Sequence, residues 1–136
     1  MFKTIYKFDI RKPFLVIYTL LLFLGLFFTI GRWYSQSTDF VIINSFINSH
    51  ISNFSLSLMS YLGIGFIWLM RDVQFRLIIL LGIIYVIGNF LCETLMTFVN
   101  TPDIVDAYFG ILGTFIGFLF LFTTKKYGLI PIKSTH

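Results

Sequence analysis

Charged side chains are scarce in this sequence of 136 residues. Asp, Glu, Lys and Arg together make up 12% of the chain, whereas hydrophobic residues make up 57%. Ordinary soluble domains contain roughly 25% charged residues. A soluble protein of this length cannot hide so much apolar surface, because small domains bury the smallest fraction of what their chains expose. The composition therefore excludes a soluble globular domain and predicts that lipid surrounds most of the surface.

Cysteine is also nearly absent, and so are the common catalytic motifs. The chain has one cysteine, Cys92, which excludes an internal disulfide. Its place in an apolar run predicts a packed thiol rather than a reactive one. The sequence contains no G-x-S-x-G elbow, no H-E-x-x-H and no P-loop, the motifs that serine hydrolases, zinc proteases and nucleotide-binding enzymes carry. No reaction can be assigned from a motif.

What the sequence has instead is a series of long apolar runs. Each is close to the ~20 residues that a helix needs to cross the hydrocarbon layer, and Pro13 suits the first turn of the first helix. The sequence therefore predicts an all-α fold, a polytopic membrane protein in which residues 1–136 form one domain. We expect a four-transmembrane-helix bundle with a short interfacial segment at its outer face, and a disordered tail after Lys126. The predicted helices cover about residues 14–31, 50–70, 77–95 and 105–124.

Two parts of this scheme have alternatives. The basic start and first apolar run also resemble a signal peptide, but the run is longer than such a segment and no small-x-small cleavage site follows it. A retained helix is the favoured interpretation. Residues 35–49 are rich in polar side chains, and apolar residues recur among them at helical spacing. They are either an interfacial helix or the frayed start of the next span.

The basic residues predict the orientation. All of them except Arg32 fall at the N-terminus, in the connection 71–76 or at the C-terminal end. By the positive-inside rule, both termini of this multi-pass membrane protein are expected to face the cytoplasm. The formal net charge of +4 is then a topology signal, and we expect no nucleic-acid partner.

Polar residues of three predicted helices reach the outer level together. His50, Glu93 and Asp106 each lie roughly 25 to 31 Å from the basic residue at the far end of the same helix, at 1.5 Å per residue. The hydrocarbon layer is about 30 Å thick. Small residues on the last helix recur at spacings of three and four, which is typical of close packing in lipid. We expect a polar pocket that opens outward, with His50, Asn89, Glu93, Asp103 and Asp106 as ligand-binding residues and Gly110, Gly113 and Gly117 as packing residues.

The same residues permit other interpretations. Glu93, Asp106 and His50 are candidate catalytic residues, since carboxylates and imidazole perform acid–base chemistry. The spacing matches no strong metal motif, so we expect no metal and no other cofactor. Asp103 and Asp106 also suit the N-terminus of the last helix, where carboxylates cap free N–H groups. Glu93, near a helix C-terminus, needs a cationic partner such as His50 or Arg32.

The order of these residues resembles the VanZ-like family of small bacterial integral membrane proteins. The matching pattern covers residues 49–122 and consists of His50, Gly88 with Glu93, Asp103 with Asp106, and then Gly113 and Gly117. Three positions depart from the family pattern: Met96, Thr101 and Gly110 replace a frequent Gln, a basic residue and Asn. The founding member is linked to resistance to the glycopeptide teicoplanin.

The resemblance implies a multi-pass protein of the bacterial inner membrane. Together with the shared depth of His50, Glu93 and Asp106, it predicts an envelope protein that binds a lipid, a cell-wall precursor or a glycopeptide antibiotic at the outer face. Membrane lipids are its expected surroundings and partners. One alternative is a membrane enzyme that acts on a lipid-linked substrate. Another is a structural subunit whose glycine stripe packs against a different membrane protein or against a second copy of the chain.

Overall fold

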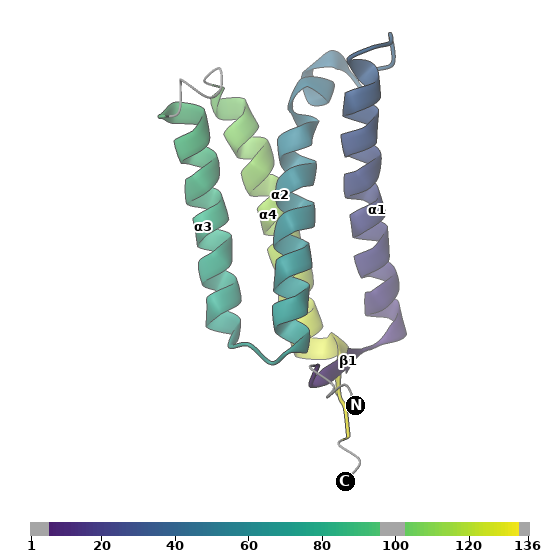
Figure 1. The fold of residues 1–136 in the computed structure, drawn as a ribbon, viewed down its shortest axis with the longest axis vertical. Coiled ribbons are helices and arrows are strands. Elements are labelled where there is room, and N and C mark those ends of the chain that lie inside the picture. Colours follow the sequence, from purple (N-terminus) through teal and green to yellow (C-terminus); the bar gives the residue numbers. More distant parts are fainter. Residues whose placement is uncertain (1–5, 96–102, 134–136) are drawn as a thin grey trace, which may run out of the picture.

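Four long α-helices dominate the computed structural model, which describes residues 6–95 and 103–133. Of the described residues, 79% are helical. The four helices lie side by side in Figure 1, and each is long and apolar enough to cross a membrane. The predicted all-α, four-helix membrane bundle is confirmed. The helices are α1 (Lys12–Ser35), α2 (Ser45–Met70), α3 (Phe75–Thr94) and α4 (Ile104–Thr123).

The second helix begins earlier than the sequence predicts. Asn44 precedes α2 with an extended backbone, and its side-chain oxygen accepts a hydrogen bond of 2.8 Å from the Ile47 N–H. Such a cap satisfies one of the free donors of a helix start. Of residues 35–49, all of them described, residues 45–49 therefore belong to the start of α2, and the structure shows no interfacial helix in this stretch. Residues 36–44 connect α1 to α2, and Ser45 opens the second helix.

Helix α2 is the centre of the bundle and packs closely on α4. Leu58, Tyr61 and Leu62 of α2 are fully buried. The glycines of α4 permit the close approach: a methyl group at Gly113 would collide with the backbone carbonyl of Phe54. Gly113 and Gly117 thus face α2 of the same chain, and Gly110 faces Asn89 of α3. The stripe is occupied by contacts within the chain, and packing against another protein stays a prediction.

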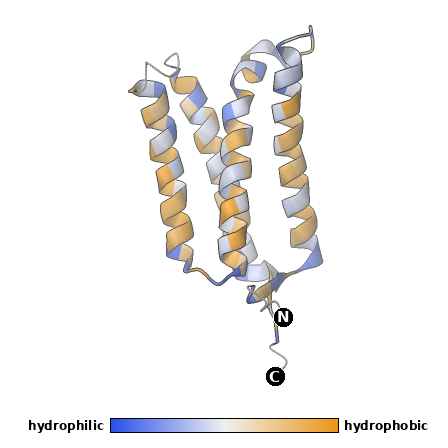
Figure 2. Ribbon diagram, viewed as in Figure 1, coloured by the Kyte–Doolittle hydropathy of each residue, from blue (hydrophilic) through white to orange (hydrophobic). Residues whose placement is uncertain are grey.

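Apolar side chains cover the outward faces of the helices. Examples are Phe23 in α1, which is 64% exposed, and Ile84 in α3, which is 56% exposed. Figure 2 shows hydrophobic residues along the length of the bundle and hydrophilic residues gathered toward its ends. This distribution fits a protein whose lateral surroundings are lipid.

A small sheet joins the two ends of the described chain. Strand β1 (Phe8–Ile10) pairs antiparallel with β2 (Leu129–Pro131), so that Phe8 lies opposite Pro131. A π-helical turn, η1 (Thr124–Gly128), leads from α4 into β2. The Arg11 N–H donates a 2.8 Å hydrogen bond to the Gly128 carbonyl. The prediction of a disordered tail after Lys126 is therefore wrong for the segment that contains β2.

The strands β1 and β2 and the connection between α2 and α3 lie at one end of the bundle (Figure 1). The Lys7 N–H donates a 2.9 Å hydrogen bond to the Met70 carbonyl at the end of α2. The beginnings of α2 and α4 lie at the opposite end. We call these the terminal end and the distal end of the bundle.

Candidate functional site

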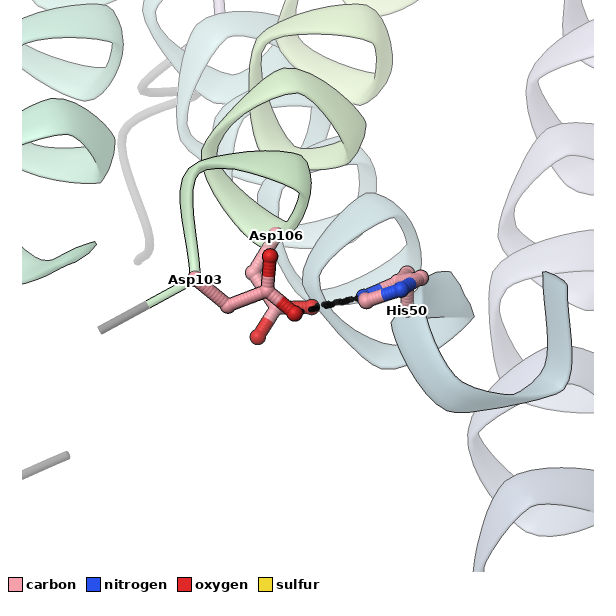
Figure 3. Close-up of side chains that lie close together, drawn as sticks. All are labelled: His50, Asp103 and Asp106. Atoms are coloured by element: carbon pink, nitrogen blue, oxygen red, sulfur yellow. Dashed lines mark hydrogen bonds and ion pairs between the residues drawn. The ribbon is translucent and has the colours of Figure 1, made fainter. Parts of the chain in front are cut away.

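At the distal end, an imidazole from α2 meets two carboxylates from the start of α4. The distance from His50 Nδ1 to Asp106 Oδ1 is 2.6 Å, and that from His50 Nδ1 to Asp103 Oδ2 is 3.5 Å. Figure 3 shows both carboxylates on the side of the imidazole that carries Nδ1. We call His50, Asp103 and Asp106 the distal cluster.

The start of α4 holds its two aspartates in place. Asp103 is the N-cap residue, and its Oδ1 accepts a 3.0 Å hydrogen bond from the Val105 N–H. Asp106 lies in the first turn, where a carboxylate interacts favourably with the helix dipole. The cap interpretation therefore applies to Asp103, but capping uses only one of its oxygens. The other oxygen faces His50, so one residue serves the helix and the cluster.

Aromatic rings shield the imidazole. The centre of the Phe46 ring lies 5.0 Å from the centre of the His50 ring, and the centre of the Phe109 ring lies 5.5 Å from it. The side chain of His50 is 12% exposed, compared with 19% for Asp106 and 39% for Asp103. Access to the cluster is therefore from the side of Asp103. Sequence reasoning missed Phe46, although its position four residues before His50 places it on the same helix face.

The electrostatic character of the distal cluster is negative. Two ionised carboxylates outweigh a single imidazole, whether the imidazole is neutral or protonated. Because the rings of Phe46 and Phe109 partly exclude water, a cationic group would interact with these carboxylates more strongly than it does in bulk water. The arrangement is suited to a cationic group, such as an amine or a metal ion, or to hydroxyl donors.

Asn89 marks the level at which α2, α3 and α4 meet. Its Nδ2 donates a 3.3 Å hydrogen bond to the Ser57 hydroxyl of α2. On α4, Gly110 leaves space for the same side chain, because a methyl group there would collide with the amide of Asn89. Asn89 therefore has a structural role at the contact of the three helices. Its ligand-binding role stays a prediction.

One helical turn nearer the distal end, each of the three helices carries a polar residue. Residues four apart share a face of a helix, which places Asn53 above Ser57, Glu93 above Asn89 and Asp106 above Gly110. Asn53 is not among the predicted site residues, although it lies three residues after His50 and so on a neighbouring part of the same helix face. Where the three helices meet, the side-chain amide of Asn89 therefore lies one helical turn further from the distal end than the polar side chains of Asn53, Glu93 and Asp106.

Glu93 lies apart from the distal cluster. Its side chain is buried, at 6% exposure, and it lines a cavity of about 350 Å³ between α2 and α3 together with Asn53 and Asn89. Among the described residues, the group of close acidic and imidazole atoms comprises His50, Asp103 and Asp106 without Glu93. The structure thus forms two neighbouring polar regions where the sequence predicts one pocket.

Cys92 also lines the cavity and is exposed, so the prediction of a packed thiol is wrong.

The distal cluster has the donor atoms of a metal site. One potential ligand atom each from His50, Asp103 and Asp106 lies within 4.8 Å of the others, and zinc accepts nitrogen and carboxylate ligands of this kind. The hydrogen bond between Nδ1 and Asp106 would have to open for both atoms to bind an ion. The sequence predicts no metal because the His lies far from the aspartates in the chain.

The fold defines the class as a multi-pass membrane protein. Comparison of the chain with protein-family models, with curated proteins and with solved structures gave no match. The resemblance to the VanZ-like family thus depends on the residue pattern alone and stays a prediction.

Proposed function

We propose that this protein resides in the bacterial cell membrane and binds an amphiphilic ligand at the outer face through the distal cluster. The observation that carries the proposal is the meeting of His50 with Asp103 and Asp106 at the end of the bundle. The ligand would be a lipid, a lipid-linked cell-wall precursor or a glycopeptide antibiotic of the teicoplanin kind. The VanZ-like residue pattern supports the same assignment.

The chemistry of the cluster supports recognition of a polar headgroup that carries an amine or hydroxyls. Carboxylate oxygens accept hydrogen bonds from such groups, and charge-assisted bonds are the stronger ones. The apolar tail of the ligand would remain in the lipid that surrounds the helices. The outward orientation is supported by the basic residues of the terminal end, which favour the cytoplasmic side.

A binding experiment tests the proposal directly. The protein is purified in nanodiscs of native lipid, and the bound species are identified by native mass spectrometry. Asp106→Asn keeps the shape of the side chain but removes its charge, so the retained ligand should fall about tenfold, as expected for loss of a charge-assisted bond. Asp39→Asn is the matched control, because this exposed residue lies in the connection between α1 and α2. Identical bound species in all three proteins would refute the proposal.

A membrane enzyme is the second candidate, and the 2.6 Å distance between His50 Nδ1 and Asp106 favours it. An aspartate at one ring nitrogen orients an imidazole and leaves the other nitrogen as a general base. His50→Gln would then abolish turnover of a lipid-linked substrate while its binding persists, whereas a pure binding protein shows no turnover in either form. Glu93→Gln tests the predicted catalytic role of the second carboxylate in the same assay.

A further inference from the structure

The terminal end contains a groove that the proposed function does not use. It has a volume of about 440 Å³ and lies between strand β1, the start of α1 and the end of α2. Its walls are formed mostly by apolar side chains, including Leu15 of α1 and Phe66, Ile67 and Met70 of α2. Tyr6, Phe8, Asp9, Ile10 and Ile132 complete the lining.

Basic residues are frequent in the chain segments that line this groove. Every lining segment except the start of α1 has a lysine or arginine directly next to a lining residue in sequence. Lys125 approaches from η1, since its Nζ lies 5.7 Å from the ring centre of Phe8. The adjacent basic residues are Lys7 beside Phe8, Arg11 beside Ile10, Arg71 beside Met70 and Lys133 beside Ile132.

The acidic residues of this region, Asp9 and Asp72, are outnumbered by the basic ones. Asp9 lines the groove and accepts a 2.8 Å hydrogen bond from the Ile10 N–H. Asp72 lies 3.6 Å from Lys7 in an exposed ion pair. The backbone segments that carry Arg11 and Lys125 meet, because the Arg11 N–H donates a hydrogen bond to the carbonyl of Gly128 in the η1 turn that contains Lys125.

We propose that this groove binds one anionic phospholipid. The acyl chain lies against the apolar walls between α1 and α2, and the phosphate lies at the rim beside Arg11 and Lys125. Charge complementarity selects the occupant, because basic pockets at the ends of transmembrane helices attract anionic headgroups. The apolar walls favour a lipid over a free phosphate ion, which offers nothing to cover them.

Lipid competition tests the charge selectivity. The protein, purified in neutral detergent, receives equal amounts of phosphatidylglycerol and phosphatidylcholine with the same acyl chains, and native mass spectrometry measures the retained ratio. The unchanged protein should retain phosphatidylglycerol preferentially. Arg11→Gln combined with Lys125→Gln should reduce this preference about 25-fold, since each basic residue near an anionic surface changes affinity about fivefold.

Arg32→Gln is the control, because it removes one positive charge at the other end of α1, away from the groove. It should leave the preference unchanged. Equal retention of both lipids by the unchanged protein would overturn the proposal. So would an equal loss in the control and in the double variant. Circular dichroism and size exclusion establish that each variant is folded.

A second variant tests the groove itself. Ile67 is 46% exposed and lines the apolar wall, so Ile67→Trp should fill the groove without disturbing the core. Retained phosphatidylglycerol should then fall to the level of the double variant. A folded Ile67→Trp protein that keeps its lipid would show that the charges act without the groove and would overturn the proposal.

Discussion

At the scale of single residues, His50 depends on side chains that come from another helix. Its Nδ1 lies 2.6 Å from Asp106 Oδ1, and hydrogen bonds to charged groups contribute roughly 1.5 to 3 kcal/mol. His50→Leu would leave Asp106 facing an apolar group in a partly buried place. We expect a loss of about 2 kcal/mol in stability, measured by thermal unfolding in detergent. Asp39→Ala should change stability little, and an equally stable His50→Leu protein would contradict this account of the pair.

Asp103 allows capping to be separated from ligand binding. Asn is as good an N-cap residue as Asp, whereas Ala costs about 1 kcal/mol. Asp103→Ala should therefore lower stability by about that amount, and Asp103→Asn should leave it unchanged. Both variants remove the carboxylate that faces His50, so both should weaken ligand binding. If Asp103→Asn binds ligand as well as the unchanged protein, the second carboxylate has no part in the site.

At the scale of helices, the glycines of α4 decide how closely α2 approaches. Gly113→Ala places a methyl group against the rigid backbone carbonyl of Phe54. Overpacking of this kind costs roughly 1 to 3 kcal/mol. The matched control is Gly63→Ala in α2, since nothing lies within 4 Å of the added methyl group there. The comparison is made by thermal unfolding in detergent, and equal stability of the two variants would contradict the packing role.

The sequence predicts the helices well because their apolar length is a property of each segment alone. Boundaries depend on single caps: Asn44 starts α2 at Ser45, but its cap is one polar residue in a stretch that contains many. The pairing of β1 with β2 could not be predicted, because both strands are very short and far apart in the chain. Three residues are too few for a pattern of alternating hydrophobicity.

The candidate site is a harder problem than the fold. Helical rise correctly brings His50 and Asp106 to one level, since it depends only on the number of residues between them and the helix ends. It also brings Glu93 to that level, yet Glu93 lies in the cavity between α2 and α3. Rotation about a helix axis depends on packing, such as the contact of Asn89 with Ser57. A single sequence contains no direct record of that contact.

At the scale of the whole molecule, the uneven distribution of charge predicts how the protein sits in the membrane. Basic residues gather at the terminal end, and Arg32 is alone at the distal end. A green fluorescent protein fused after Lys133 should fluoresce, because this fusion folds in the cytoplasm. Alkaline phosphatase at the same position should be inactive. The same fusions placed after Phe40 should give the reverse result, and an active phosphatase after Lys133 would refute the orientation.

The strand pairing at the terminal end has a consequence for biogenesis. Phe8–Ile10 precedes α1 to α4 in the chain and leaves the ribosome before these four helices, whereas Leu129–Pro131 leaves after them. Strand β1 therefore stays unpaired while the translocon releases the helices into the membrane one after another. The pairing of β1 with β2 can form only after the helices have inserted, and only when both strands lie on the same side of the bilayer. In a chain with one helix misinserted the two strands would stay unpaired. Such a chain would expose both strands to quality-control proteases.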